Sequence, residues 1–220
     1  MKLVDWLSNV LRHLKALSNS STHHQRKRVS FIAAWAKSPL KIGAILPSSR
    51  ALAHAMAQTA AIHADNRIVV ELGAGTGMVT QALVNVGITS NNLIVVEREA
   101  LLLEILAQQF PTLCVVGHDA QYLDALLQER NIDEVGVVVS SLPLLTMPRV
   151  VREKIESQMV KAIGKEGTIV QFTYGSNSPI PKTRWAEYHI YGQRITRVLT
   201  NIPPAKVWIY QPDRREKPRD

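Results

Sequence analysis

Short apolar runs alternate with amphipathic segments from residue 68 onward, the pattern of a sheet flanked by helices. The expected strands are Ile68–Leu72, Leu93–Val96, Val115–Val116, Val135–Val139, Thr168–Phe172, Ile190–Leu199 and Ala205–Tyr210. The expected helices are Met78–Val86, Ala100–Gln109, Tyr122–Leu127 and Val150–Ile163. We expect Val135–Val139 to be central because it is apolar throughout, and the last two strands to form an antiparallel pair. The predicted fold class is therefore α/β, a Rossmann-like, seven-stranded, doubly wound sheet.

The N-terminal region has a different pattern. Residues 3–17 predict an amphipathic helix, because Leu3, Leu7, Val10, Leu14 and Leu17 recur at steps of four and three. A polar, basic stretch follows at Ser18–Arg28. The helix could pack on the core or on a second copy of the chain, or it could lie on an anionic bilayer. The charged tether favours the bilayer.

The chain thus divides into four predicted regions. Residues 1–28 hold the membrane-binding helix and its tether, residues 29–60 form a helical cap over the active site, and residues 213–220 form a disordered tail. The Ser48-Ser49 pair predicts the N-cap of a helix through Ala51–Ala60 within the cap. Residues 61–212 are the catalytic domain, so the fold carries an N-terminal helical extension.

Composition indicates which partners and which cellular compartment to expect for the chain. Its net charge of +8 favours nucleic acid or an anionic membrane as partner. No run of 18 apolar residues occurs and no signal peptide is visible, so neither a transmembrane helix nor secretion is predicted. Cys114 is the single cysteine, which fits a reducing, cytoplasmic compartment.

The first predicted strand runs into a glycine-rich turn, Glu71-Leu-Gly-Ala-Gly-Thr-Gly77, which opens a helix. Glycines let backbone N–H groups approach a ligand at a helix N-terminus. The spacing is not that of a dinucleotide site, and an acid precedes the glycines. A cofactor with a carboxylate, an ammonium and a sulfonium suits such a turn, although the glycines could serve a tight turn alone.

Acids end the next two predicted strands. Glu97 stands where doubly wound folds bind ribose hydroxyls, and Asp119 could accept a hydrogen bond from an adenine amino group. Glu97 could also be a solvated strand-end acid, and Asp119 a helix N-cap. Three strand ends directed at one ligand nevertheless form a joint signal for S-adenosylmethionine, the cofactor of class I methyltransferases.

The fourth predicted strand ends in Ser140-Ser141-Leu142-Pro143-Leu144. Amino-directed methyltransferases often carry Asn-Leu-Pro-Tyr here, where a polar side chain and a rigid carbonyl accept hydrogen bonds from the amine. Leu144 replaces the aromatic residue that would stack on a planar base, a loss of roughly 1–3 kcal/mol for a nucleobase. A flexible aliphatic amine loses nothing, although Ser141 could simply belong to an ordinary turn.

These residues resemble the soluble, rhizobial-type bacterial phosphatidylethanolamine N-methyltransferases. The similar stretches are Phe31 to Ser49, Glu71–Gly77, Ser140-Ser141-Leu142-Pro143-Leu144-Leu145 and Asn201-Ile-Pro-Pro-Ala-Lys-Val-Trp208. The family also has an N-terminal amphipathic helix that binds anionic lipid. Ser141 departs from the glycine expected there, which could narrow the amine pocket and change the number of methyl transfers.

The resemblance implies the site residues. The cofactor site would comprise Glu71, Gly73, Ala74, Gly75, Gly77, Glu97, Arg98, Asp119, Ala120 and Ser140. Ser140 and Ser141 would face the amine as catalytic residues, and Tyr174 would lie near the lipid headgroup or in the core. The lipid amine must lose a proton before transfer, and His118, Tyr174 and His189 are candidates to accept it.

The expected function is N-methylation of phosphatidylethanolamine and its methylated intermediates, with the enzyme peripheral on the inner face of the cytoplasmic membrane. The expected partners are the phospholipid substrate and an anionic membrane bound through residues 2–28, with no nucleic acid and no metal. One alternative is a relative of rRNA adenine N6-methyltransferases, disfavoured by Leu144 and by the lack of a C-terminal helical domain. Another is a non-catalytic protein that binds the cofactor or a membrane.

Overall fold

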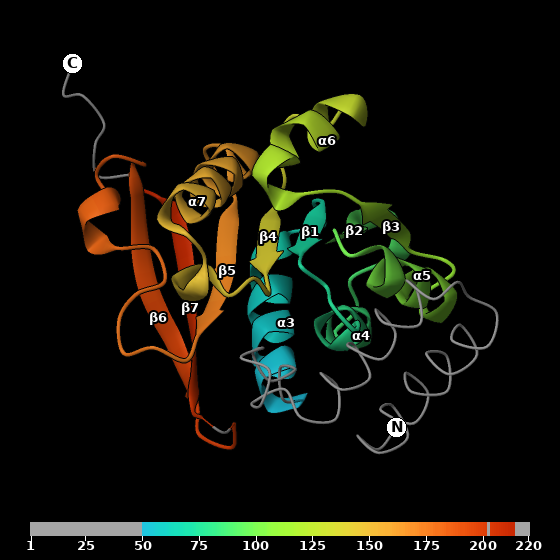
Figure 1. Cartoon of the computed structure of the whole chain (residues 1–220), viewed down its shortest axis with the longest axis horizontal. Helices are drawn as coiled ribbons and strands as arrows, with labels where there is room; N and C mark the ends of the chain where they lie inside the picture. The colour runs from blue at the N-terminus through green and yellow to red at the C-terminus, as the bar shows by residue number, and fades with distance from the viewer. Residues whose placement is uncertain (1–49, 202, 214–220) are drawn as a thin grey trace.

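A computed structural model describes residues 50–201 and 203–213 and places a single seven-stranded sheet between two layers of helices (Figure 1). The strands are β1 (Val69–Leu72), β2 (Leu93–Glu97), β3 (Cys114–Gly117), β4 (Val137–Ser140), β5 (Thr168–Thr173), β6 (Ile190–Val198) and β7 (Ala205–Pro212). The α-helices are α3 (Arg50–Ala64), α4 (Met78–Asn85), α5 (Ala100–Gln109), α6 (Leu123–Glu129) and α7 (Arg149–Ile163). Short 3₁₀ turns are η2 (Ser90–Asn92), η3 (Ala120–Tyr122), η4 (Leu144–Thr146) and η5 (Lys182–Arg184).

The strand order is β3-β2-β1-β4-β5-β7-β6. Strands β1 to β5 run parallel, whereas β7 pairs antiparallel with both β5 and β6. This order confirms the predicted doubly wound sheet, the central place of β4 and the closing antiparallel pair. The strand order switches between β1 and β4, because β2 and β3 extend the sheet to one side and β4 and β5 extend it to the other. The carboxyl ends of β1 and β4 therefore open a crevice at the sheet edge, where ligands bind in such folds.

Alternation along each strand builds a core on both faces of the sheet. Helices α3, α4 and α5 cover one face, where Val69, Val137 and Phe172 point. Helices α6 and α7 cover the other face, where Val70, Val138 and Tyr210 point. The parallel strands are buried on both faces, which explains why their sequences are apolar without alternation.

Helix α3 belongs to the core of the sheet. Its residues Leu52 and Met56 are fully buried, in one cluster with strand residues of β4, β5 and β7. The helix begins at Arg50 and continues to Ala64, so the predicted division at residue 60 falls inside it. Ser48-Ser49, the helix of residues 3–17 and the tail after residue 213 lie outside the described residues.

Candidate active site

The carboxyl ends of β1, β2, β3 and β4 surround a cavity of about 400 Å³, which we call the cofactor cavity. Its lining includes six of the residues predicted as cofactor-binding or catalytic: Gly73, Glu97, Arg98, Asp119, Ala120 and Ser141. Four strand ends meet here because the parallel strands share one direction. The six residues, which were predicted from separate strand ends, therefore lie around one cavity.

Glu97 ties the end of β2 to the glycine-rich turn after β1. Its Oε2 accepts a hydrogen bond from the Gly75 N–H at 2.8 Å, and its Oε1 accepts one from the Glu99 N–H at 2.8 Å. Gly75 has a φ of 60°, a left-handed conformation that favours glycine. The carboxylate retains acceptor capacity for a ligand, since each of its oxygens can accept more than one hydrogen bond.

Glu71 lies beneath the turn and does not line the cofactor cavity. It alternates along β1 with Val70 and Leu72, which sends its side chain to the face covered by α4. There its Oε2 accepts a hydrogen bond from the Thr80 hydroxyl at 2.7 Å, while Oε1 is buried without a hydrogen-bond partner among the described residues. Burial raises the pKa of Glu71 to about 8, with a smaller contribution from the nearby charge of Glu97 and against the opposing effect of the Thr80 hydrogen bond.

Asp119 combines the two roles that the sequence allowed. Its Oδ1 accepts the Gln121 N–H at 2.9 Å, which caps η3, and its Oδ2 accepts a hydrogen bond from Arg98 Nη1 at 3.2 Å. Both Asp119 and Arg98 also line the cofactor cavity. Although partial burial opposes it, hydrogen bonding by Gln121 and Arg98 lowers the pKa of Asp119, so its carboxylate is ionised beside the cavity.

The two serines that the resemblance assigned to the amine have different surroundings at the end of β4. Ser140 is fully buried, and its hydroxyl accepts a weak hydrogen bond from the Leu142 N–H at 3.4 Å. Ser141 lines the cofactor cavity, and its hydroxyl is buried without a hydrogen-bond partner among the described residues. Pro143 follows with φ −81° and ψ 63°, the centre of an inverse γ-turn closed by Leu144 N–H on the Leu142 carbonyl at 3.0 Å.

Gln171 supports this turn, a role that the sequence reading missed. The side chain is fully buried in β5, opposite Ser140, and its Nε2 donates to the Leu142 carbonyl at 2.9 Å. A signal was present in the sequence, because Gln171 is an amide between Val170 and Phe172 in the interior of a strand that is apolar except at its two ends. A buried amide requires hydrogen-bond partners, and a neighbouring strand end is where they are found.

Tyr174 lines a second cavity, of about 240 Å³, which we call the acceptor cavity. Its lining residues are Pro143, Leu144, Leu145, Thr146, Phe172, Thr173, Tyr174, Gly175 and Pro179. Pro143 borders both cavities. Burial raises the pKa of Tyr174, partly offset by a hydrogen bond with Asn201, so its phenol stays protonated at neutral pH.

Two of the candidate proton acceptors, His118 and His189, lie at different edges of the sheet. His118 lines the cofactor cavity, with Nδ1 3.0 Å from the Asp119 carbonyl oxygen. His189 precedes β6 at the opposite edge of the sheet, because Ile190 pairs with Pro212 whereas the Thr173 end of β5 pairs with Lys206. The interpretation of His189 as a proton acceptor at the site was therefore wrong, since position in sequence does not reveal which sheet edge a residue reaches.

Apolar residues from α7 and the turn before it complete the cofactor cavity. They are Met147, Pro148, Val151 and Ile155, none of which the sequence reading assigned to the site. The cavity thus joins acids and backbone groups on the strand ends to an aliphatic wall. This arrangement fits S-adenosylmethionine, because Glu97 can bind ribose hydroxyls, the Asp119 region can bind adenine, and the apolar wall can cover the adenine ring.

No protein-family model matches the chain. A relative, the ornithine lipid N-methyltransferase of Singulisphaera acidiphila, is 30% identical over 144 residues, which cover 63% of this chain and 72% of the relative.

Two solved structures resemble the fold. The magnesium protoporphyrin IX methyltransferase of Synechocystis PCC 6803, with bound S-adenosylmethionine, aligns with a TM-score of 0.59 at 8% identity, covering 75% of this chain and 80% of that chain. The 1,6-didemethyltoxoflavin-N1-methyltransferase of Burkholderia thailandensis aligns with a TM-score of 0.58 at 13% identity, covering 88% and 92%. These likenesses confirm the predicted class I methyltransferase fold.

Proposed function

The chain belongs to the family of S-adenosylmethionine-dependent methyltransferases that includes the ornithine lipid N-methyltransferase of S. acidiphila, and on this premise we propose that it methylates the amine of a membrane lipid. The proposed acceptor is phosphatidylethanolamine together with its methylated intermediates, converted toward phosphatidylcholine at the membrane surface. The observation that carries the proposal is the relative itself, of which the chain covers 72% and which acts on the amine of a lipid.

The cofactor is S-adenosylmethionine, which supplies a methyl group bound to a sulfonium sulfur. In our proposal Glu97 holds the ribose, Asp119 and Ala120 hold the adenine end, and the turn from Gly73 to Gly77 faces the amino-acid end. Glu71 acts from beneath the turn through Thr80. Arg98 keeps the Asp119 carboxylate oriented through their ion pair, whose contribution is small because Arg98 is 74% exposed.

The protein contributes to transfer mainly by positioning. The acceptor nitrogen would sit beside Ser141 and Pro143, where the two cavities meet, with its lone pair directed toward the cofactor cavity. Holding the reacting groups in line replaces a bimolecular encounter by an oriented one. A lipid ammonium first releases a proton, and His118, which lines the cofactor cavity, is our proposed acceptor for it, directly or through water.

Leu144 supports an aliphatic amine as acceptor. The residue is buried beneath the acceptor cavity and presents no ring face on which a nucleobase could stack. The relative's substrate favours a second candidate acceptor, the amine of ornithine lipid. Both candidates offer a primary amine on a short methylene chain at the bilayer surface, so the same site could serve either.

The route to the membrane is proposed from the sequence. None of the helices in the described part of the chain is long and apolar enough to cross a bilayer. The described residues hold nearly equal numbers of acidic and basic side chains, so the net charge of +8 arises from residues 1–49 and 214–220. We propose that residues 2–28 dock on anionic lipid at the inner face of the cytoplasmic membrane.

The proposal is tested with the full chain, S-adenosylmethionine labelled in the methyl group, and anionic vesicles that contain phosphatidylethanolamine or ornithine lipid. We expect label in the chromatographed lipid. Label in ornithine lipid alone would replace phosphatidylethanolamine by the second candidate. Label in added RNA, with none in lipid, would refute lipid methylation altogether.

A further inference from the structure

Two carbonyls of the turn after β4, those of Leu142 and Pro143, are already occupied. The Leu142 carbonyl accepts two hydrogen bonds, from the Leu144 N–H at 3.0 Å and from Gln171 Nε2 at 2.9 Å. The Pro143 carbonyl also accepts two, from the Thr146 N–H at 2.9 Å and from the Thr146 hydroxyl at 3.0 Å. A carbonyl oxygen has two lone pairs, so neither carbonyl has one left for an amine N–H.

The Ser141 hydroxyl is the side-chain acceptor that remains at this turn. Ser141 lines the cofactor cavity, and its hydroxyl is buried at the turn without a hydrogen-bond partner among the described residues. The predicted acceptor pair of a polar side chain and a rigid carbonyl is therefore reduced to the side chain. An amine at this turn can have one N–H accepted by Ser141, whereas the Leu142 and Pro143 carbonyls offer no lone pair to a second N–H, which is costly to leave unpaired.

The acceptor cavity, on the other side of Pro143, is suited to apolar groups such as methyl groups. Its lining contains no charged side chain. Its two threonine hydroxyls are engaged locally, because Thr146 donates to the Pro143 carbonyl and Thr173 accepts the Gly175 N–H at 2.9 Å. Phe172 and Tyr174 add aromatic wall, packed edge to face with centroids 5.3 Å apart. Such walls bind methyl groups on nitrogen by apolar contact and by cation–π attraction.

From these two observations we infer that the acceptor site prefers an amine that already carries at least one methyl group over a primary amine. The inference rests on the proposed function and specifies its preferred substrate as a secondary or tertiary alkylamine. A secondary amine has a single N–H for Ser141 and places its methyl group in the acceptor cavity. The reaction that supplies this substrate is a first N-methylation of the primary amine.

The transfer step conserves atoms and charge for both the secondary and the tertiary amine. The lone pair of the neutral amine forms the new N–C bond while the bond from methyl to sulfur breaks, and the electron pair of that bond stays on sulfur. The nitrogen gains the positive charge that the sulfur loses. A secondary amine thus becomes a tertiary ammonium that keeps its remaining proton at neutral pH, whereas a tertiary amine becomes a quaternary ammonium without an N–H.

Gln171 is a positioning residue for this selectivity. Its Nε2 occupies one lone pair of the Leu142 carbonyl, and its place on β5 fixes the distance between that strand and the turn. Replacing Gln171 by leucine would free the carbonyl to accept a second amine N–H. The selectivity for methylated amines should then fall even where overall activity falls too.

The first test compares three acceptors in identical anionic vesicles: phosphatidylethanolamine and its N-methyl and N,N-dimethyl forms. We expect kcat/KM to rise roughly tenfold from the primary to the methylated amines, since one unaccepted N–H is removed and a methyl group is buried. Equal values, or the highest value for the primary amine, would overturn the inference. If ornithine lipid is the acceptor, its primary and N-methylated forms replace the series.

The second test uses Gln171→Leu with Gln158→Leu as the matched control. Gln158 is a half-buried glutamine of α7 whose Oε1 accepts the Asp124 N–H of α6 at 2.7 Å and does not line either cavity. Gln171→Leu should reduce the tenfold preference to about twofold, whereas Gln158→Leu should leave the ratio unchanged. A uniform decrease for all three lipids in Gln171→Leu would show a merely structural role and contradict the inference.

A binding measurement gives a readout independent of turnover. Calorimetry without methyl donor, on water-soluble short-chain versions of the three lipids, should give a Kd for the methylated forms roughly tenfold below that of the primary amine. No methylation of any lipid would refute the proposed function. Methylation that depends on acyl-chain length but not on N-methyl number would keep that function and instead assign the acceptor cavity to hydrocarbon.

Discussion

At the scale of single residues, Glu97 couples the glycine-rich turn to the end of β2 through the Gly75 N–H. Glu97→Ala should weaken S-adenosylmethionine binding roughly tenfold to a hundredfold, because a charge-assisted hydrogen bond to ribose contributes about 1.5–3 kcal/mol. Calorimetric titration measures the change. Glu104→Ala, an exposed acid of α5, is the control and should bind as the parent does. Unchanged affinity in Glu97→Ala would contradict the ribose assignment.

Glu71 should make stability depend on pH. Burial raises its folded pKa to about 8 from an ordinary value of 4.5, so between these values the unfolded chain ionises while the folded chain keeps the proton. Folded stability should therefore decrease as pH rises from 4.5 to 8, by up to about 1.4 kcal/mol per pH unit. Urea unfolding at several pH values measures this slope.

Glu71→Gln supplies the control for that slope. The amide is neutral at every pH and keeps an acceptor for the Thr80 hydroxyl, so the decrease should disappear in the variant. An equally steep decrease in both proteins would assign it to another group. Activity in Glu71→Gln would also support a role beneath the turn that needs no negative charge.

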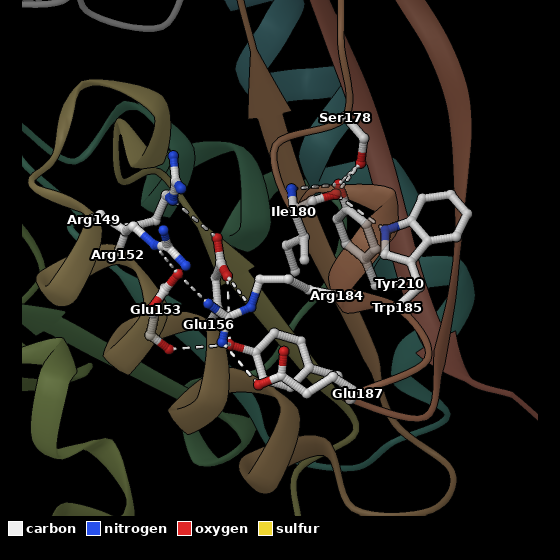
Figure 2. A network of polar contacts seen from close by, with 11 residues as sticks. Arg149, Arg152, Glu153, Glu156, Ser178, Ile180, Arg184, Trp185, Glu187 and Tyr210 are labelled. Carbon is white, nitrogen blue, oxygen red and sulfur yellow. Dashed lines mark hydrogen bonds and ion pairs between the residues drawn. The ribbon is translucent and has the colours of Figure 1, made fainter.

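At the scale of elements, an ion-pair network joins η5 to α7 (Figure 2). Arg184 contacts Glu153 and Glu156 of α7 as well as Glu187, and Glu156 is fully buried between Arg184 and Arg152. Tyr210 anchors the same connection, with its hydroxyl 2.7 Å from the Ser178 hydroxyl and accepting the Ile180 N–H at 3.1 Å. The network holds the connection between β5 and β6 on the helix that also walls the cofactor cavity.

Arg184→Met should destabilise the fold by about 3 kcal/mol, because it removes one of two cations beside the buried Glu156 carboxylate. Arg149→Met is the matched control, since Arg149 also pairs with Glu153 but is 81% exposed. Its loss should cost below about 1 kcal/mol. Chemical denaturation compares both variants with the parent, and equal effects would show that burial does not strengthen the Arg184 network.

Strands and helices were predictable where local pattern decides them. Ala100–Gln109 was predicted at the bounds the structure shows, and Thr168–Phe172 only one residue short. The helix predicted at Tyr122–Leu127 is α6, which begins one residue later and follows a 3₁₀ turn, η3, that was not predicted. A capping acid creates this tight turn, and apolar spacing alone does not distinguish a 3₁₀ turn from the start of an α-helix.

The site was predictable as far as strand ends define it. Glu97 and Asp119 follow apolar strands, and parallel strands bring their ends together. The engagement of the Leu142 carbonyl by Gln171 was not predictable, because the two residues lie 29 positions apart. The burial of Ser140 beside Ser141, which lines the cofactor cavity, was equally hidden, since it depends on where β4 ends and the turn begins.

At the scale of the whole molecule, catalysis and membrane binding are proposed to lie in separate parts of the chain. Leu7→Glu combined with Leu14→Glu should abolish sedimentation with anionic vesicles, because both residues belong to the predicted apolar stripe. Each nearby Lys or Arg adds about 1 kcal/mol toward an anionic surface, so added salt should weaken binding of the parent.

The control for this pair is Ser8→Glu combined with Asn9→Glu, which adds the same charge at positions off the stripe. It should retain more binding than the stripe variant. Equal sedimentation of the stripe variant and the parent would place membrane attachment elsewhere. Thermal unfolding of the catalytic domain should be the same in all three proteins.

The most direct test of the central claim is lipid mass spectrometry on a bacterial host that makes no methylated lipids. Expression of the parent chain should produce lipids that carry one or more additional methyl groups on the headgroup nitrogen. Expression of Glu97→Ala should strongly reduce them. An unchanged lipid profile with the parent chain, at confirmed expression and with cofactor binding intact, would contradict the account.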